Sequence, residues 1–264
     1  MEAISIVTGA GGFLGHVLFD MLYERGHNVI GIDIKPIKEW PNKHRKKYKG
    51  AVLLRRRVSE SLDDLPEIER VLRDIHGFAI FHLACPVTAV RPSFNRSAKV
   101  FSAVDDIGCV MEFAENHSAR IVFASSQLAQ YPGTSPYATM KHCCEQLLRN
   151  HYPRHIIIRL PSVYGKNGSM KGTSAGIVGT YLSLLEQHKP IEVYKQNSIP
   201  RTFANVDDVC EAIINSNTNE NEGKTINLDG EDLTPTEIAN IVYSQENEKY
   251  LIHNRQDLWF ETDP

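Results

Sequence analysis

Two side chains that could move a proton lie four residues apart, at Tyr137 and Lys141. A free phenol has a pKa of about 10, but a nearby ammonium stabilises the phenolate and lowers that pKa. Residues i and i+4 share one face of a helix, so Lys141 can reach the surroundings of Tyr137. Tyr137 is the only one of the ten tyrosines with a lysine four residues on. The pair predicts acid–base chemistry, and an exposed helical Tyr–Lys pair is the alternative.

A glycine-rich loop near the N-terminus follows a short apolar run at residues 3–7, and apolar residues recur at helical spacing after it. A strand, a glycine turn and a helix are therefore predicted in that order. Gly9 allows a tight turn, Gly12 lets the backbone approach a pyrophosphate, and Gly15 lets the helix pack closely on the strand. The helix N-terminus also offers free N–H groups to anionic oxygens. We expect a dinucleotide to meet the loop residues Gly9, Gly11, Gly12, Phe13, Leu14 and Gly15.

The next predicted strand, residues 28–33, ends on Asp33, 18 residues after Gly15. An acid in this place hydrogen-bonds the adenosine ribose of NAD and repels the 2′-phosphate of NADP. NAD is therefore the predicted cofactor. NADP is not excluded, because Lys35 and the basic residues that follow it up to residue 49 could offset the repulsion. A solvated loop is the plainer interpretation of that basic segment.

Segments of helical periodicity alternate with predicted strands near residues 3–8, 28–33, 51–55, 78–83, 120–124 and 155–159. This alternation predicts an α/β fold, a Rossmann-type doubly wound parallel sheet that binds ligands at the carboxyl ends of its strands. From about residue 165 the pattern changes to a loop, a helix at 174–188 and short strands at 191–194 and near 202–206. We expect a dinucleotide-binding domain at 1–165 and a small substrate-binding lobe at 166–264, interleaved with the end of the core.

Four further motifs accompany these features: Phe81-His82-Leu83-Ala84-Cys85, Phe123-Ala124-Ser125-Ser126, Arg159-Leu160-Pro161-Ser162-Val163-Tyr164-Gly165 and Arg201-Thr202-Phe203-Ala204-Asn205-Val206-Asp207-Asp208-Val209. With them the sequence resembles the extended short-chain dehydrogenases/reductases, the NAD-dependent epimerase/dehydratase family that acts mostly on nucleotide sugars. The resemblance covers nearly the whole chain to about Gly230.

The resemblance implies a role for each side chain of the reaction centre. Ser126, the third position after Phe123, would hydrogen-bond the reacting oxygen, and Ser125 would face the cofactor or the backbone. Tyr137 would act as general acid or base. Lys141 would hold the nicotinamide ribose and lower the pKa of Tyr137.

The resemblance also implies a set of binding residues. Cofactor contacts would come from Arg57, Leu83, Ala84, Cys85, Ser125, Tyr137, Lys141, Pro161 and Val163. Simple packing after a strand is an equal alternative for Pro161 and Val163. Substrate contacts would come from Ser126, Ser162 and Arg201, whose guanidinium suits a pyrophosphate. A surface salt bridge with Asp207 or Asp208 is the alternative for Arg201.

Several positions depart from the family pattern. Gln127 and Leu128 stand where dehydratases carry an Asp-Glu pair, which argues against elimination of water. Tyr137 follows Ser126 by only 11 positions, about half the usual length in extended relatives, so one wall of the substrate pocket should be truncated. Asp105 replaces a family Asn in a loose alignment. Arg57 stands where an acid commonly meets the adenine, which leaves that contact open.

Composition limits the other possibilities. The net charge of −3 and the pI near 6.4 give no signal for nucleic acid or anionic membranes. We see no charged leader and no membrane-spanning stretch, so a soluble, cytoplasmic protein is expected. Five cysteines without metal-type spacing predict reduced thiols and no metal site. A homodimer through helices at 94–115 and 137–150 is weighed against core packing within one subunit.

The sequence thus predicts an NAD-dependent epimerase or 4-ketosugar reductase acting on a small-molecule substrate, a nucleotide sugar. Two alternatives stay open. One is a reductase of a small carbonyl compound without a nucleotide, which the short segment after Ser126 favours. The other is a dinucleotide-sensing protein without turnover, against which the intact Ser126, Tyr137 and Lys141 argue.

Overall fold

The structure is a computed structural model that describes residues 3–40, 50–60, 62–63, 65–72, 77–85, 94–165, 176–187, 189–194, 200–250 and 259–262. The basic residues expected at positions 43–49 lie outside the described residues. Two compact units divide the chain. Unit 1 comprises Met1–Leu160 and Asp207–Leu228, and unit 2 comprises Pro161–Val206 and Asp229–Pro264.

Seven strands of unit 1 form one sheet in the order β10-β6-β5-β4-β1-β2-β3. Every neighbouring pair in this sheet is parallel. The strands are β1 (Ile4–Thr8), β2 (Asn28–Asp33), β3 (Val52–Arg55), β4 (Ala79–His82), β5 (Arg120–Ser126), β6 (His155–Leu160) and β10 (Thr225–Asn227). The direction of winding reverses between β1 and β4, so the loops after these two strands flank the place where such sheets bind ligands.

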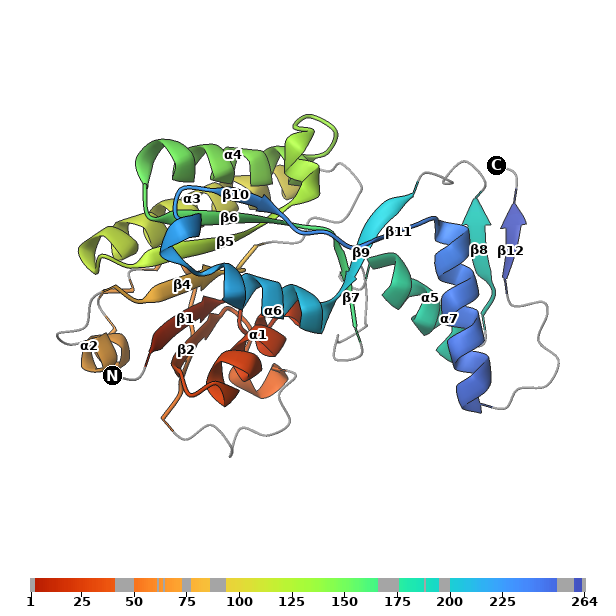
Figure 1. Cartoon of the computed structure of the whole chain (residues 1–264), viewed down its shortest axis with the longest axis horizontal. Coiled ribbons are helices and arrows are strands. Elements are labelled where there is room, and N and C mark those ends of the chain that lie inside the picture. Colours follow the sequence, from red (N-terminus) through yellow and green to blue (C-terminus); the bar gives the residue numbers. More distant parts are fainter. Residues whose placement is uncertain are drawn as a thin grey trace. The chain divides into compact units, whose positions relative to one another are not determined.

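Helices cover both faces of this sheet (Figure 1). α1 (Phe13–Glu24) and α6 (Val206–Ser216) lie on one face, and α3 (Phe94–Asn116) and α4 (Pro136–His151) on the other. A short helix, α2 (Pro66–Leu72), lies beside β1 and β4 at the end of the sheet away from the glycine loop. The predicted Rossmann-type doubly wound fold is confirmed.

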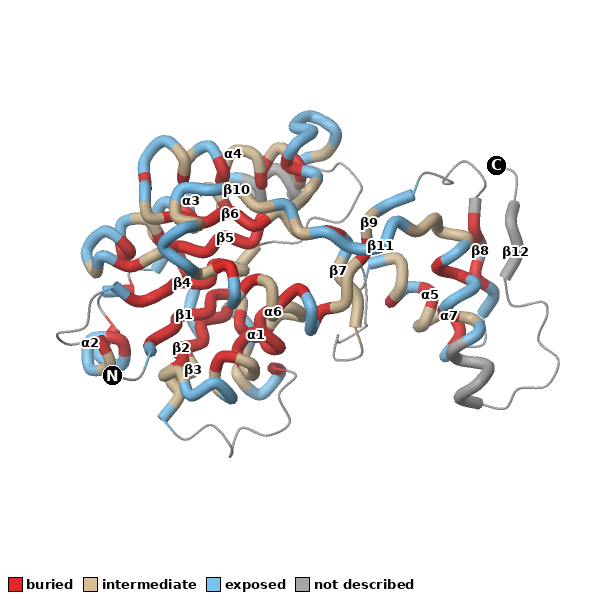
Figure 2. Tube along the Cα trace, in the orientation of Figure 1, coloured by how far each residue is buried: buried red, intermediate tan, exposed pale blue. Residues whose placement is uncertain are grey.

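The core of unit 1 follows from the strand sequences, which are apolar runs because both faces are covered. In Figure 2 the central strands β1, β4, β5 and β6 are buried along most of their length. Ile6, Ile80, Ile121 and Ile157 come from these four strands and have no exposed surface. Such a rigid centre fixes where the strand ends, and the side chains on them, can lie.

Unit 2 is built from short strands and two helices. One sheet has the order β11 (Glu231–Leu233), β9 (Arg201–Asn205), β7 (Ser162–Tyr164), and another pairs β12 (Trp259–Thr262) with β8 (Ile191–Tyr194). α5 (Gly176–Glu186) and α7 (Pro235–Tyr250) complete it. Its separate core includes Tyr181, Ile191, Phe203 and Ile238. The predicted helix at 174–188 and strand at 191–194 correspond to α5 and β8.

Helices α3 and α4 pack against each other within unit 1. Phe113 and Leu148, which lie on the two helices considered for a dimer interface, are buried in the core of unit 1. Met111 and Leu147 pack partly against the same core, whereas Phe101 is 74% exposed. Packing within one subunit therefore accounts for most of these apolar residues, and the homodimer stays a prediction.

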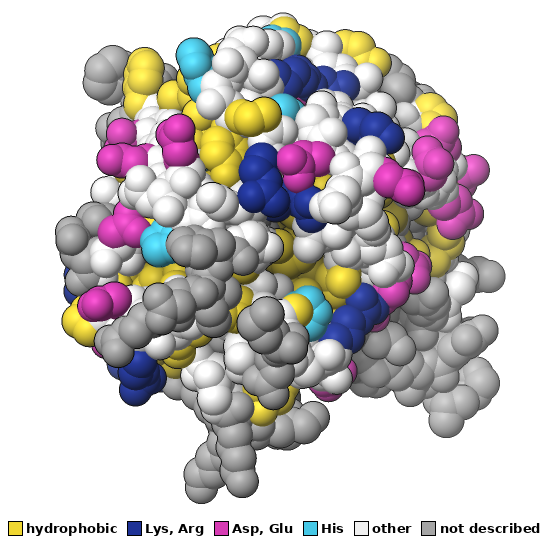
Figure 3. Space-filling model, turned by 60° about the vertical axis from the view of Figure 1, so that its left-hand side comes forward, with side chains coloured by type: hydrophobic (Ala, Val, Ile, Leu, Met, Phe, Trp, Pro, Cys, Tyr) yellow, Lys and Arg dark blue, Asp and Glu magenta, His cyan; other side chains and the backbone are white. Residues whose placement is uncertain are grey.

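Charged side chains of both signs lie beside one another on the face drawn in Figure 3. In the part of the chain that the structure describes, no helix is both long and apolar enough to span a bilayer. The described residues also contain no group of three or more His, Cys, Asp or Glu side chains placed to hold a metal ion.

Gly15 tests the close packing of α1 on the loop after β1. A Cβ at residue 15 would lie 2.0 Å from the Gly9 carbonyl oxygen, a backbone atom that cannot move alone. We expect Gly15→Ala to destabilise the protein by about 3 kcal/mol or more in urea unfolding. Gly108→Ala is the matched control, because this helical glycine has open space around it. That change should stabilise by about 0.5–1 kcal/mol. Equal effects of the two substitutions would contradict the role of Gly15.

Candidate active site

The glycine loop after β1 leaves no room for side chains at two positions. Gly9 has φ +72°, and a Cβ there would lie 2.8 Å from the backbone nitrogen of Ala84, in the loop after β4. A Cβ on Gly15 would clash with the Gly9 carbonyl oxygen. The loop therefore runs as a tight turn between the ends of β1 and β4 into the first turn of α1. This open backbone cradle fits the pyrophosphate of a dinucleotide.

Asp33 lies at the end of β2 next to this loop and is 8% exposed. Its carboxylate accepts the backbone N–H of Gly11 at 2.9 Å and that of Lys35 at 2.8 Å. The carboxylate thus faces the glycine loop, where the ribose of a bound dinucleotide would meet it. The contact of Asp33 with a ribose stays a prediction.

Ser126 and Tyr137 come from the end of β5 and the start of α4. Ser135 caps α4 by accepting the Ala138 N–H at 3.1 Å, and Pro136 fixes the first turn. The Ser126 hydroxyl accepts the Leu128 N–H at 3.2 Å and is hydrogen-bonded with Tyr137. Because a hydroxyl has one hydrogen and two lone pairs, Ser126 can still donate a hydrogen bond while it accepts one from Leu128.

Lys141 lies one turn beyond Tyr137 on α4 and is 3% exposed. Its ammonium donates to the Ala124 carbonyl oxygen at 2.5 Å and lies 4.6 Å from the ring centre of Phe123 and 5.9 Å from that of Tyr137. Burial lowers the pKa of Lys141, but the neighbouring Cys85 and Tyr137 more than offset this, and its net pKa is raised. The lysine therefore stays charged at neutral pH.

Tyr137 shows two opposing influences. Burial raises its pKa above the usual value, while the Lys141 ammonium and the hydrogen bond with Ser126 act in the lowering direction. The net pKa is raised. The expected lowering by Lys141 is thus present, but in this structure it does not overcome burial. The phenol keeps its proton at neutral pH unless a further positive charge comes near it.

His82 ends β4 beneath these groups, and its ring stacks on Phe123 with 5.8 Å between ring centres. Its Nδ1 lies 2.8 Å from the Thr8 hydroxyl, which also accepts the Ala84 N–H. Burial, helped by the Lys141 charge, lowers the pKa of His82 to about 3. His82 is therefore neutral and adds no positive charge beside Lys141.

The Ser125 side chain contacts helix α4. The residue is 2% exposed, and its hydroxyl donates to the Glu145 carboxylate at 2.5 Å. The side chain therefore faces α4 within the fold, and a contact of Ser125 with a cofactor stays a prediction. Because Arg159 is the cross-strand neighbour of Ser125, both reach Glu145 from the same face of the sheet.

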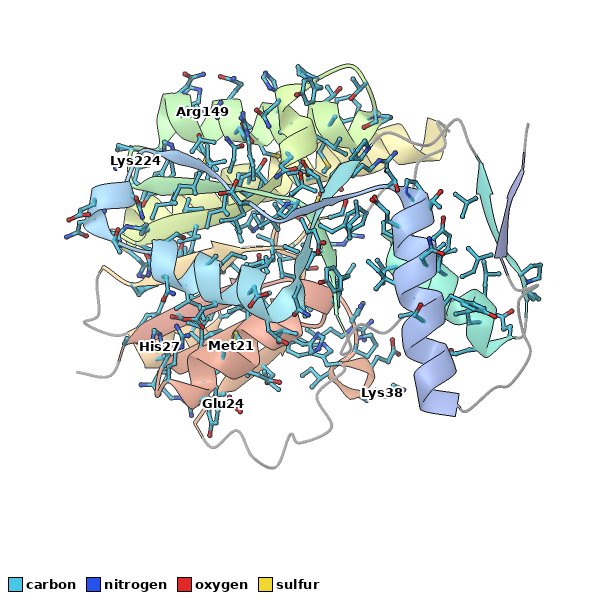
Figure 4. The ribbon with its side chains drawn as sticks, turned by 45° about the vertical axis from the view of Figure 1, so that its right-hand side comes forward. Met21, Glu24, His27, Lys38, Arg149 and Lys224 are labelled. Atoms are coloured by element: carbon cyan, nitrogen blue, oxygen red, sulfur yellow. The ribbon has the colours of Figure 1, made fainter. Side chains whose placement is uncertain are left out.

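Glu145 is fully buried, and its carboxylate is the negative charge with which the neighbouring arginines pair. Arg159 donates to its two oxygens at 2.9 and 2.7 Å, and Arg149 donates at 2.8 Å. Arg149, labelled on α4 in Figure 4, also donates to Thr225 of β10 at 2.9 Å. Burial disfavours the carboxylate, but hydrogen bonds from Arg159 and Ser125 hold the pKa of Glu145 below its usual value.

The predicted cofactor contacts Leu83, Ala84 and Cys85 follow β4 and are partly exposed. Cys85 lies beside Lys141, and burial raises the pKa of its thiol. Arg57 is exposed and lies near Asp106, a half-buried acid whose pKa is raised by burial. Asp105, the residue aligned with the family Asn, is exposed. Their contacts with a cofactor stay predictions.

The remaining predicted residues belong to unit 2. Pro161 is buried, Val163 is half-buried and Ser162 is exposed on β7. Arg201 is exposed at the start of β9, where its strand neighbour is Leu233. Contacts of these residues with a cofactor or a substrate stay predictions as well.

The structure adds residues that the sequence reasoning missed. Glu145 follows Lys141 by four positions, so helical spacing was a usable signal for it. Trp40 covers Gly11, since a Cβ on Gly11 would lie 2.9 Å from the indole. No sequence rule links Trp40 to the loop, because the contact depends on the path of the chain after β2.

With this geometry in view, the chain can be compared with known proteins. The model of the NAD dependent epimerase/dehydratase family matches residues 5–229. The chain belongs to this family, and the recognition made from the motifs is confirmed. NAD is the cofactor of the family, and the glycine loop with Asp33 fits it.

Individual relatives are distant. The chain is 26% identical over 247 residues to UDP-glucose 4-epimerase of Mycolicibacterium smegmatis, covering 85% of this chain and 76% of that protein. It is 31% identical over 153 residues to cinnamoyl-CoA reductase 2 of Medicago truncatula, covering 52% of this chain and 42% of the reductase. The structure of UDP-glucuronic acid 4-epimerase from Bacillus cereus, in complex with UDP-glucuronic acid and NAD, matches with a TM-score of 0.78 and 18% identity, covering 98% of this chain and 86% of that one.

Glu145 should contribute strongly to stability. Because its folded-state pKa is lowered, its contribution is present above the unfolded-state pKa of about 4.5 and is lost as the pH falls through the folded-state value. We expect Glu145→Gln to cost about 3–5 kcal/mol at pH 7, since it leaves two arginines beside an uncharged amide. The difference from wild type should shrink in urea titrations at acid pH.

Glu60→Gln is the control for this prediction. Glu60 pairs with Arg56 at the surface, where both side chains are 50% exposed. Its replacement should cost less than about 1 kcal/mol. The assignment fails if Glu145→Gln costs as little as Glu60→Gln.

Proposed function

We propose that this protein is an NAD-dependent 4-epimerase or 4-ketosugar reductase of a nucleotide sugar. The observation that carries the proposal is that Tyr137 lies close to both Ser126 and Lys141 beside the end of β5. Two further observations support the proposal. The family is NAD-dependent, and the glycine loop fits the pyrophosphate of that cofactor. NAD, when bound, supplies hydride acceptance and donation, and its oxidised nicotinamide is cationic.

The chain's own residues handle the proton. As the phenolate, the form that Lys141 and the positive charge of a bound oxidised cofactor would favour, Tyr137 takes the hydroxyl proton of the sugar when that carbon is oxidised; as the phenol, it returns a proton when the carbonyl is reduced. Lys141 favours the phenolate form by charge. Ser126 donates a hydrogen bond to the sugar oxygen, which stabilises the negative charge that develops on it. Arg201 holds the pyrophosphate of the substrate.

The names of several relatives support a nucleotide-sugar substrate. They include UDP-glucose 4-epimerase and dTDP-L-rhamnose 4-epimerase, at 26% and 22% identity. Dehydration is disfavoured, because Gln127 carries an amide that donates to the Leu228 carbonyl at 2.9 Å and Leu128 is apolar. Neither can serve as the acid–base pair for loss of water.

A reductase of a small carbonyl compound is the second candidate. The single 3₁₀ turn at Gln127–Gln130 occupies much of the short segment between Ser126 and Tyr137. The match to cinnamoyl-CoA reductase 2, although it covers 52% of the chain, favours the same alternative. Mass spectrometry of ligands released from freshly purified protein separates the two, since a retained NAD favours the epimerase. Turnover of UDP-glucose, assayed beside a carbonyl compound without a nucleotide, gives the direct comparison.

Tyr137→Phe tests the acid–base role. The substitution removes the transferable proton and should lower kcat by about 100-fold or more, with NAD affinity nearly unchanged. Tyr131→Phe is the matched control, because this tyrosine is 62% exposed and lies six residues earlier. Steady-state kinetics with the best substrate found above would check both variants. Near-normal turnover by Tyr137→Phe would remove it as the acid or base.

Arg201→Ala tests the nucleotide part of the substrate. Loss of a charged hydrogen bond worth about 1.5–3 kcal/mol should raise KM for a nucleotide sugar by about 10-fold to 100-fold. NAD affinity should not change. Arg201→Lys should recover part of the loss, because lysine keeps the charge without the planar fork. If Arg201→Ala handles nucleotide sugars as well as wild type, the small-carbonyl reductase becomes the better hypothesis.

A further inference from the structure

The thiol of Cys85 lies between the loop after β4 and helix α4. Its S–H donates to the Met140 sulfur at 3.8 Å, and it is also hydrogen-bonded with the Lys141 side chain. Because an ammonium can only donate, the thiol sulfur is the acceptor in this second bond. The two contacts form a chain in which Lys141 donates to Cys85 and Cys85 donates to Met140, which is fully buried.

Lys141 carries three N–H groups, and the protein around it accepts two of them. The Ala124 carbonyl oxygen, near the end of β5, accepts one at 2.5 Å, and the Cys85 sulfur accepts another. The ammonium is thus bonded from two neighbouring strands, by β5 itself and by the loop after β4. A lysine has a flexible four-carbon stem, so a single acceptor would leave its ammonium free to swing about that acceptor.

The loop that carries Cys85 is itself held against the glycine loop. The Ala84 N–H donates to the Thr8 hydroxyl at 3.2 Å, and a Cβ on Gly9 would lie 2.8 Å from the same Ala84 nitrogen. Cys85 follows Ala84 directly, so these contacts limit where its side chain can lie. The thiol therefore links a fixed part of the cofactor cradle to helix α4.

Four titratable groups lie near the Lys141 ammonium, on β4, on the loop after it and on α4. Burial lowers the pKa of His82 to about 3 and raises that of Cys144 to about 12, so both are neutral at pH 7. Burial also raises the pKa of Cys85, whose thiol therefore keeps its proton. The fourth group is Tyr137, and the Lys141 charge acts to lower its pKa. This effect weakens as the distance between the two groups grows.

We propose that Cys85 is a positioning residue of the reaction centre: its sulfur, together with the Ala124 carbonyl, holds the Lys141 ammonium beside Tyr137. A serine can replace the thiol in this task, because its hydroxyl also accepts and donates, whereas an alanine cannot. The importance of this contact for catalysis rests on the proposed acid–base role of Tyr137. The hold on Lys141 does not depend on which substrate reacts, so it can be tested without turnover.

The protonation of Tyr137 reports where the Lys141 ammonium lies. Full-length protein, labelled with carbon-13 at the phenol carbon of its tyrosines and saturated with oxidised NAD, is titrated with base and followed by NMR. The Tyr137 signal is the one that disappears in Tyr137→Phe. Cys85→Ala removes the acceptor for Lys141, and Cys85→Ser keeps one. Cys143→Ala is the matched control, because Cys143 is a half-buried cysteine on α4, two residues after Lys141.

In Cys85→Ala the midpoint of the Tyr137 titration should rise by about 0.5–1 pH unit, because the ammonium spends less time near the phenol. The Kd for NAD, measured by calorimetry, should rise by about threefold to tenfold, because Lys141 is no longer held toward the nicotinamide ribose. Cys85→Ser should recover about half or more of both changes, since it restores an acceptor. Cys143→Ala should show neither change.

Three results would overturn the proposal. One is a Tyr137 titration in Cys85→Ala that matches wild type, even if urea unfolding shows a loss of stability, because the thiol then only fills space. Another is a rise that Cys85→Ser does not reduce, and a third is an equal rise in Cys143→Ala. A wild type that turns over no nucleotide sugar contradicts the proposed function instead and leaves the Tyr137 titration unaffected.

Discussion

The attachment of α4 to the end of β5 is the constraint on which the rest of the site depends. Two side chains one helical turn apart make it: Lys141 donates to the Ala124 carbonyl, and Glu145 accepts the Ser125 hydroxyl. The two bonds end on Ala124 and Ser125, the two residues that precede Ser126 in β5. The strand thus presents Ser126 at a fixed distance from the first turn of α4, where Tyr137 lies. Because Arg159 of β6 also donates to Glu145, helix α4 is bonded to two strands of the sheet, β5 and β6.

The same attachment places permanent charge in a dry interior, and the surroundings are arranged to tolerate it. Glu145 is matched by two guanidinium groups, which is the condition for a buried carboxylate to stay ionised. Lys141 donates to the Ala124 carbonyl oxygen and lies over the Phe123 ring. Burial keeps the neighbouring His82 neutral. Tyr137 differs from these two charged groups, because its protonation would respond to an added charge, which suits its proposed acid–base role.

The sequence predicted the fold and the glycine loop because these follow local rules: strand–turn–helix order, glycine spacing, and an acid at the end of the next strand. It also placed Tyr137 and Lys141 correctly on one helix. The hydrogen bond between Ser125 and Glu145 was not predicted, because adjacent serines look alike until strand register places one of them beside Arg159. The contact of Trp40 with Gly11 was likewise out of reach, since it depends on the path of the loop after β2.

The order of the chain within the two units has a consequence for synthesis. Residues 161–206 interrupt unit 1, which is completed only by Asp207–Leu228. Until Thr225–Asn227 has emerged from the ribosome, β6 is the open edge of a parallel sheet, and Ile157 and Ile158 on it lack the neighbour that pairs with them in the finished protein. An unpaired apolar edge is where a nascent chain is most prone to join another chain. A fragment that stops near residue 165 would keep that edge permanently, so a single cut after this residue does not yield a complete unit 1.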